Sequence, residues 1–222
     1  MKRECDRHIH TPGTSTPQAS APRYRAVELA AHRNNRAATR VHTTGAGGFN
    51  VWRNSFPAEH LPPGGSEVEV GGVPFSFPPV GEGDDNVRCD GQFVEVAVHR
   101  YDWIHLLAAA ERRTEDTVEL HYADGSVDSE WLRVSDFWSA PAWFGELPAL
   151  RTPVMHYPYH VQPGLSAHLW AQRVPVPRRT ALAGLRLPRN IAVHLFAATV
   201  QEPPPGTAGL PATHREEDGR DH

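Results

Sequence analysis

The chain of 222 residues is long enough for one domain with a substantial core, and its 39% hydrophobic and 22% charged residues are ordinary for a globular protein. A formal net charge of −4 offers no broad basic surface, so neither nucleic acid nor a membrane is expected as a partner. No apolar run has the length of a signal peptide or a membrane span, which predicts a cytoplasmic protein.

Both ends of the chain have the composition of segments without a core of their own. Residues 1–44 are rich in Arg, Pro, Ser, Thr and Ala and predict a flexible extension. Within them, "YRAVELAAHRNNRAATR" is compatible with a short helix or with no stable structure. Residues 201–222 combine prolines, glycines and charges and predict a disordered tail. The folded domain is therefore expected over residues 45–200.

Between these limits, short alternating segments are cut by turn residues, which is typical of an all-β sandwich or barrel. "SEVEVGGVPFSF" predicts a hairpin with a glycine turn, and "TVELHYADGSVDSEWLRV" predicts a second hairpin around Asp-Gly. "GQFVEVAV", "LSAHLWAQRVPV" and "IAVHLFAATV" predict further strands, whereas "PVPRRTALAGLRLPRN" predicts a solvated loop and strand edge. "YDWIHLLAAAERR", residues 101–113, fits a helix and a strand equally well.

Several of these segments also occur, in the same order, in a known kind of domain. "VEVGGVPFSFPPVGEGDDNVRCDGQFVEV", "LLAAAE", "VELHYADGSVDSEWLRVSDFW" and "LPRNIAVHLFAATV" together resemble an accessory domain at the ends of secreted glycoside hydrolases of actinobacteria. The resemblance implies an antiparallel β-sandwich of the galactose-binding-like jelly-roll type, a fold that often binds sugars and is often stabilised by calcium. "FWSAPAWFGE" and "MHYPYHVQPG" have no counterpart in those domains, so a function specific to this chain is expected there.

The segment from residue 136 to 162 concentrates aromatic and polar side chains. Sugar rings stack their apolar faces on aromatic rings and hydrogen-bond through their hydroxyls, so this mixture predicts a ligand site. Its expected members are Trp138, Trp143, Glu146, His156, Tyr157, Tyr159, His160 and Gln162. The alternative is that Trp138 and Trp143 cover one end of the sandwich. Trp103, Trp131 and Trp170 lie within strand or helix patterns and are expected in the core.

The same segment is compatible with catalysis. A histidine titrates near neutral pH, so His156 or His160 is a candidate proton shuttle with a carboxylate such as Asp136 or Glu146 as its partner. The two histidines are four residues apart, but Pro158 between them argues against the helix that would place both on a transition metal.

The acidic turn "GEGDDNVRCDGQ" is a candidate calcium site. Calcium prefers several oxygen ligands, which Asp84, Asp85, Asn86 and Asp90 are able to supply, although their spacing is not that of an EF-hand. The alternative is a solvated turn whose side chains hydrogen-bond their own backbone.

Two functions follow from these observations, and a purely structural or interaction subunit with long disordered tails is a third possibility. The first is a stand-alone module that binds a carbohydrate-like or glycosylated small molecule. The second is a small enzyme of specialised metabolism, an isomerase, cyclase or hydrolase, that uses the same aromatic and histidine pocket for proton transfer. The nucleotide, hydrolase-elbow and zinc motifs are absent from the sequence, so no cofactor other than calcium is expected.

Overall fold

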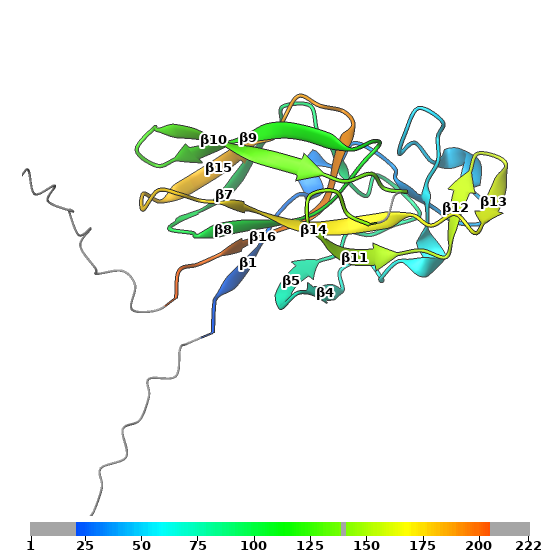
Figure 1. Cartoon of the computed structure of the whole chain (residues 1–222), viewed down its shortest axis with the longest axis horizontal. Helices are drawn as coiled ribbons and strands as arrows, with labels where there is room; N and C mark the ends of the chain where they lie inside the picture. Colours follow the sequence, from blue (N-terminus) through cyan, green and yellow to red (C-terminus); the bar gives the residue numbers. More distant parts are fainter. Residues whose placement is uncertain (1–20, 139–140, 205–222) are drawn as a thin grey trace, which may run out of the picture.

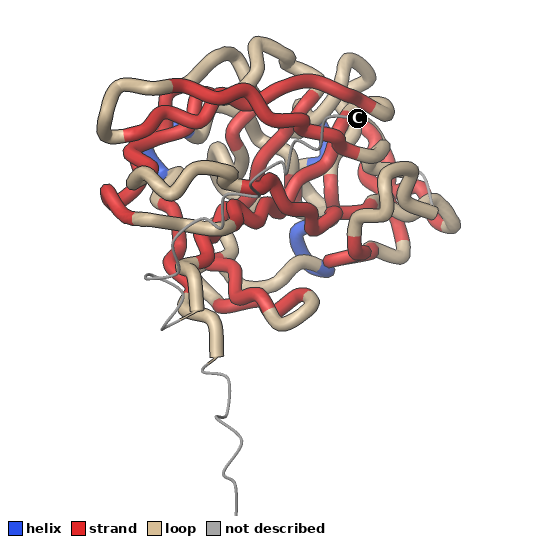
Figure 2. The backbone as a smooth tube through the Cα atoms, turned by 60° about the vertical axis from the view of Figure 1, so that its left-hand side comes forward, coloured by secondary structure: helices blue, strands red, loops and turns tan. Residues whose placement is uncertain are grey.

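The computed structural model describes residues 21–138 and 141–204. β-Strands dominate this part of the chain, and the helical pieces within it are three short 3-10 turns (Figure 2). The expected all-β class is confirmed. Residues 1–20 and 205–222, the outer parts of the two predicted tails, lie outside the described residues.

The larger of two main sheets has six strands in the order β1, β16, β8, β14, β11, with β6 beside β16. All of its pairings are antiparallel. The segment that fitted both helix and strand is its strand β8. The strands are β1 Tyr24–Val27, β6 Val87–Arg88, β8 Trp103–Ala110, β11 Leu147–Arg151, β14 His168–Pro175 and β16 Val193–Gln201.

The smaller sheet is also antiparallel and has the order β10, β9, β15, β7. The Asp-Gly hairpin expected from the sequence joins β9 to β10. Strand β15 corrects the expectation of a solvated loop: Leu182 and Leu185 are buried, and Gly184 between them, where the pairing shifts register, hides the alternation. The strands are β7 Phe93–His99, β9 Thr114–Tyr122, β10 Val127–Val134 and β15 Leu182–Arg186.

Strand β8 is apolar along its length because both of its faces are buried. Ile104, Leu106 and Ala108 join the core cluster between the two sheets. Leu107 and Ala109 join a second cluster on the opposite face of the larger sheet. The molecule is therefore a sandwich with an additional layer over the outer face of its larger sheet (Figure 1).

That additional layer is built from hairpins and short turns. The β4–β5 hairpin has Gly71 and Gly72 at φ values of 60° and 80°, as its glycine turn predicts. A second hairpin, β12–β13, lies at the other end of the molecule from strand β1 (Figure 1). The elements are β2 Ala38–Thr39, β3 Phe56–Pro57, β4 Glu67–Val70, β5 Val73–Ser76, β12 Val154–Tyr157, β13 His160–Pro163, η1 Ala30–His32, η2 Thr44–Ala46 and η3 Ala58–His60.

The folded domain begins before residue 45, which corrects the expected flexible extension for the part that the structure describes. Strand β1 pairs with β16 at the edge of the larger sheet. Further along, the backbone N–H groups of Ala37 and Ala38 each donate to the carboxylate of Asp85 at 2.8 Å. Composition did not predict this structure because the segment has no hydrophobic pattern of its own. It is held in place by partners that are far away in the sequence.

Replacing Asp85 is expected to destabilise the fold. Asp85 is fully buried, and Asp85→Ala leaves two buried N–H donors without their acceptor. We expect the free energy of unfolding to fall by about 2–5 kcal/mol, measured by urea denaturation. Asp90→Ala, at an exposed position in the same turn, is the control and should change it by less than about 0.5 kcal/mol. Equal effects of the two substitutions would contradict the structural role of Asp85.

Acid is expected to weaken the fold through buried histidines. Burial lowers the pKa of His105, His156, His168 and His194. A base with a lowered folded-state pKa binds fewer protons when folded, so stability is lost as the pH falls through the unfolded value of about 6.5. Burial also raises the pKa of Asp85 to about 6, which acts in the opposite direction below that pH.

Four histidines outweigh the two carboxyl groups whose pKa is raised, those of Asp85 and Asp136, so we expect the free energy of unfolding to decrease between pH 7.5 and pH 5. Each histidine contributes at most about 1.4 kcal/mol per pH unit. Urea denaturation at several pH values in this range gives the free energy of unfolding as a function of pH. This free energy should fall less steeply with decreasing pH for His194→Gln than for the unsubstituted protein. The same pH dependence of the free energy of unfolding in both proteins would show that His194 does not contribute to it.

Candidate functional site

The two tryptophans of the predicted aromatic segment make different contacts. Trp138 stacks on Trp52, with ring centroids 5.9 Å apart, and on the buried ring of Phe137 at 5.8 Å. Trp143 is 57% exposed and lies under the guanidinium of Arg113, whose central carbon is 4.6 Å from the ring centroid. Trp138 thus packs on other aromatic side chains, whereas Trp143 keeps most of its surface exposed.

Glu146 fastens the loop before β11 to the end of β10. Its carboxylate accepts the backbone N–H of Ser135 at 2.7 Å, the Ser135 hydroxyl at 2.8 Å and the N–H of Phe144 at 3.1 Å. The Ser135 hydroxyl oxygen in turn accepts the N–H of Trp143 at 2.8 Å. With this set of donors, the carboxylate of Glu146 has a structural role.

The remaining predicted residues belong to the β12–β13 hairpin, whose extended strands and turn agree with the absence of a helix expected from Pro158. His156 is 2% exposed, and its Nδ1 lies 2.9 Å from the hydroxyl of Thr39. Tyr157 stacks on His160 at 5.1 Å, and Nε2 of His160 lies 3.2 Å from Oε1 of Gln162. Tyr159, at the turn, is 94% exposed.

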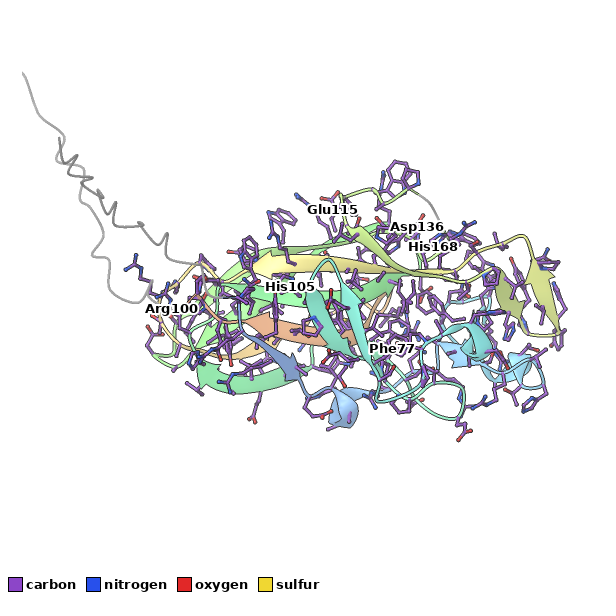
Figure 3. The ribbon with its side chains drawn as sticks, turned by 90° about the horizontal axis from the view of Figure 1, so that it is seen from below. Phe77, Arg100, His105, Glu115, Asp136 and His168 are labelled. Atoms are coloured by element: carbon purple, nitrogen blue, oxygen red, sulfur yellow. The ribbon has the colours of Figure 1, made fainter. Side chains whose placement is uncertain are left out.

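Asp136 comes from the loop after β10 and lies with His168 toward one end of the sandwich in Figure 3. Burial raises the pKa of Asp136, and the charges of Arg113 and Arg112 oppose that shift. Its Oδ1 atom is buried and has no hydrogen-bond partner among the described residues. The structure shows no bond between Asp136 and the two predicted catalytic histidines, His156 and His160, in the described part of the chain.

The acidic turn does not gather its side chains around one point. Asp85 and Asn86 are buried, and Asn86 donates to Asp85 at 2.8 Å, while Asp84 and Asp90 are exposed. Within residues 21–138 and 141–204, no group of three acidic, histidine or cysteine side chains is arranged to hold a metal ion. Calcium binding at this turn stays a prediction.

A groove of about 650 Å³ lies elsewhere, where β10, an edge strand of the smaller sheet, approaches β14 of the larger sheet beside the β4–β5 hairpin. Strand β11 pairs with β14 as far as Ala171, so the end of β14 is open on the side that faces the groove. The turn of the hairpin touches the start of β11: a Cβ on Gly71 would lie 2.6 Å from Cδ1 of Leu147. Of the residues predicted from the sequence, Glu146 lines this groove.

The groove combines apolar, aromatic and charged side chains. Val70, Val73 and Phe75 of the hairpin provide its apolar part. Trp131 of β10 is 60% exposed, and the central carbon of the Arg133 guanidinium lies 5.2 Å from its ring centroid. The polar lining residues are His105, Glu130, Arg133, Glu146, Gln172 and Arg173.

Two polar groups of the lining are partly buried. Burial and the nearby charge of Arg173 lower the pKa of His105. Its Nε2 lies 2.8 Å from Oε1 of Gln201, and this contact acts in the opposite direction by raising the pKa. The amide nitrogen Nε2 of Gln172 is buried and donates to no acceptor among the described residues. A buried donor without an acceptor is costly, so a turn of the Gln172 side chain toward the groove would be favoured by a ligand that accepts its hydrogen bond. Figure 3 shows His105 beside the β4–β5 hairpin.

Sequence reasoning missed this groove, and Trp131 shows why. Trp131 was expected in the core, which is wrong, because it lies on the exposed face of β10 while its neighbours Leu132 and Val134 are buried. The alternation of β10 contained that signal, since successive side chains of a strand point to opposite faces. No comparable signal marked Arg173 or Glu130.

None of the helical turns in the described residues has the length and apolar character needed to cross a bilayer.

Comparison with known proteins adds the family. No curated protein matches the chain. The family model of the AziU2-like beta-sandwich domain matches residues 23–204, and the chain therefore belongs to the AziU2-like β-sandwich family.

Proposed function

We propose that the protein is a binding module for a small, polar, carbohydrate-like molecule, which it holds in the groove between β10, β14 and the β4–β5 hairpin. The observation that carries this proposal is the exposed ring of Trp131 within a groove of about 650 Å³. Small-molecule sites in proteins have volumes of about 300–1,000 Å³ and combine apolar walls with a few polar groups.

The lining suits the two surfaces of a sugar ring. An apolar C–H face is able to stack on Trp131, a residue that is 60% exposed although the Arg133 guanidinium lies over its ring. Hydroxyl groups find a donor in the amide of Gln172 and an acceptor in the carboxylate of Glu130. The resemblance to galactose-binding-like modules supports the same class of ligand. The proposed site is the groove, however, and not the segment 136–162 that the sequence indicated.

The enzymatic alternative has less support. Its expected proton shuttle, His156, is buried and contacts Thr39, whereas His160 lies on the exposed hairpin. The histidine in the groove, His105, has its Nε2 against Gln201. Binding rather than proton transfer is therefore the function that the geometry favours.

The proposal is tested by thermal unfolding of the protein with a panel of monosaccharides, oligosaccharides, glycosylated metabolites and calcium. A ligand at about 100 times its Kd adds about 2.7 kcal/mol to the free energy of unfolding and raises the melting temperature. We expect Trp131→Ala to weaken binding about 10-fold or more, because the stacking surface is lost, and so to reduce that shift.

Trp143→Ala is the matched control, since Trp143 is 57% exposed and Trp131 60%, but Trp143 does not line the groove. It should leave the ligand-induced shift unchanged. Loss of the shift in Trp143→Ala with retention in Trp131→Ala would return the site to the aromatic segment. No shift with any sugar would overturn the carbohydrate proposal, and a shift with calcium alone would point to the acidic turn.

A further inference from the structure

Two opposite charges line the groove without neutralising each other. Glu130 comes from β10 and Arg173 from β14. The side chains of both make no hydrogen bond or ion pair with any residue that the structure describes, and they form no ion pair with each other. Other charges of the groove already have partners: Arg133 donates to Glu115 at 3.0 Å, and Glu146 accepts from Ser135.

Arg173 is arranged to bind an anion. Its guanidinium lies over Trp103, with the central carbon 4.1 Å from the ring centroid. Stacking uses the face of the planar guanidinium and leaves the N–H donors at its edge free for a carboxylate. The neighbouring amide of Gln172 adds a donor that has no acceptor within the described residues. The β14 side of the groove is therefore a set of donors without an acceptor.

Glu130 gives the β10 side of the groove the opposite character. Its partly exposed carboxylate accepts hydrogen bonds and carries a negative charge, which suits a ligand ammonium group. A neutral ligand would cover both charges without pairing either, and covering an unpaired charge costs free energy. The two side chains therefore select against neutral ligands as well as for charged ones.

Resting on the proposed function, we propose that the ligand of the groove is a zwitterion, with a carboxylate bound by Arg173 and Gln172 and an amine bound by Glu130. On a carbohydrate-like scaffold this describes an amino sugar that also carries an acid group. The amine and the carboxylate would be spaced to reach from β10 to β14.

Four sugars separate the contributions of the two charges. Muramic acid carries an amine and a carboxylate, glucosamine the amine, glucuronic acid the carboxylate, and glucose neither. We expect titration calorimetry at pH 7.5 to give muramic acid a Kd about 10-fold or more below those of the other three, since one added charge-assisted hydrogen bond of about 1.4 kcal/mol corresponds to that factor.

Substitutions assign each charge to its side chain. Arg173→Gln should weaken muramic and glucuronic acid about 10-fold and leave glucosamine unchanged, whereas Glu130→Gln should weaken muramic acid and glucosamine and leave glucuronic acid unchanged. Glu95→Gln on β7 and Arg112→Gln are the controls, since both residues are exposed and outside the groove. Thermal unfolding of each variant without ligand verifies that it folds.

The outcomes distinguish this inference from the proposed function. If glucose binds as tightly as muramic acid, or if both charge-removing variants bind all four sugars unchanged, the zwitterion is overturned and the binding module stands. If none of the sugars binds, but the acyclic zwitterion 6-aminohexanoate binds and depends on Arg173 and Glu130, the charges are confirmed and the carbohydrate scaffold is overturned. If none of these five compounds binds, the zwitterion is overturned, and the wider panel of oligosaccharides and glycosylated metabolites decides whether the binding module stands.

Discussion

A buried carboxylate, that of Asp85, joins the N-terminal segment to the body of the sandwich. It accepts hydrogen bonds from Ala37 and Ala38 on one side and from the Asn86 side chain on the other. Oδ1 of Asn86 lies 2.8 Å from Nδ1 of His194 in β16, so the network reaches the larger sheet. Each buried polar group that loses its partner costs about 1–3 kcal/mol. Detachment of the segment would break several of these hydrogen bonds at once, so it is strongly unfavourable.

The same network limits what the acidic turn is free to do. Its two inward side chains are committed to the fold, and its two outward ones, Asp84 and Asp90, lie in solvent. Polar groups with unused hydrogen-bonding capacity gather instead where the edge strand β10 faces the end of β14 that β11 leaves unpaired. Edge strands commonly carry charges that prevent pairing with other chains, and on β10 and at the end of β14 that β11 leaves unpaired such charges also border a groove. The affinities of the charge-removing variants separate these two roles of Glu130 and Arg173.

Sequence patterns predicted the local elements well. The Gly71-Gly72 and Asp-Gly hairpins, strands β7, β14 and β16 and the all-β class were all confirmed, because alternation and turn chemistry act within a few residues. Strand β8 stayed ambiguous because burial on both faces removes alternation. The segment around Ala37 and strand β15 were missed because distant pairing partners order the first and Gly184 interrupts the pattern of the second.

The sequence by itself determined that this chain forms strands, where most of its turns lie, and that it builds an antiparallel sandwich. Tertiary structure alone decided which side chains meet. Trp131, Gln172 and Arg173 come from strands that are about 40 residues apart in the chain, and a loop brings Glu146 beside them. The physical reason is that periodicity encodes which face a residue occupies, whereas the order of strands in a sheet and the ends of their pairing decide which faces and edges adjoin.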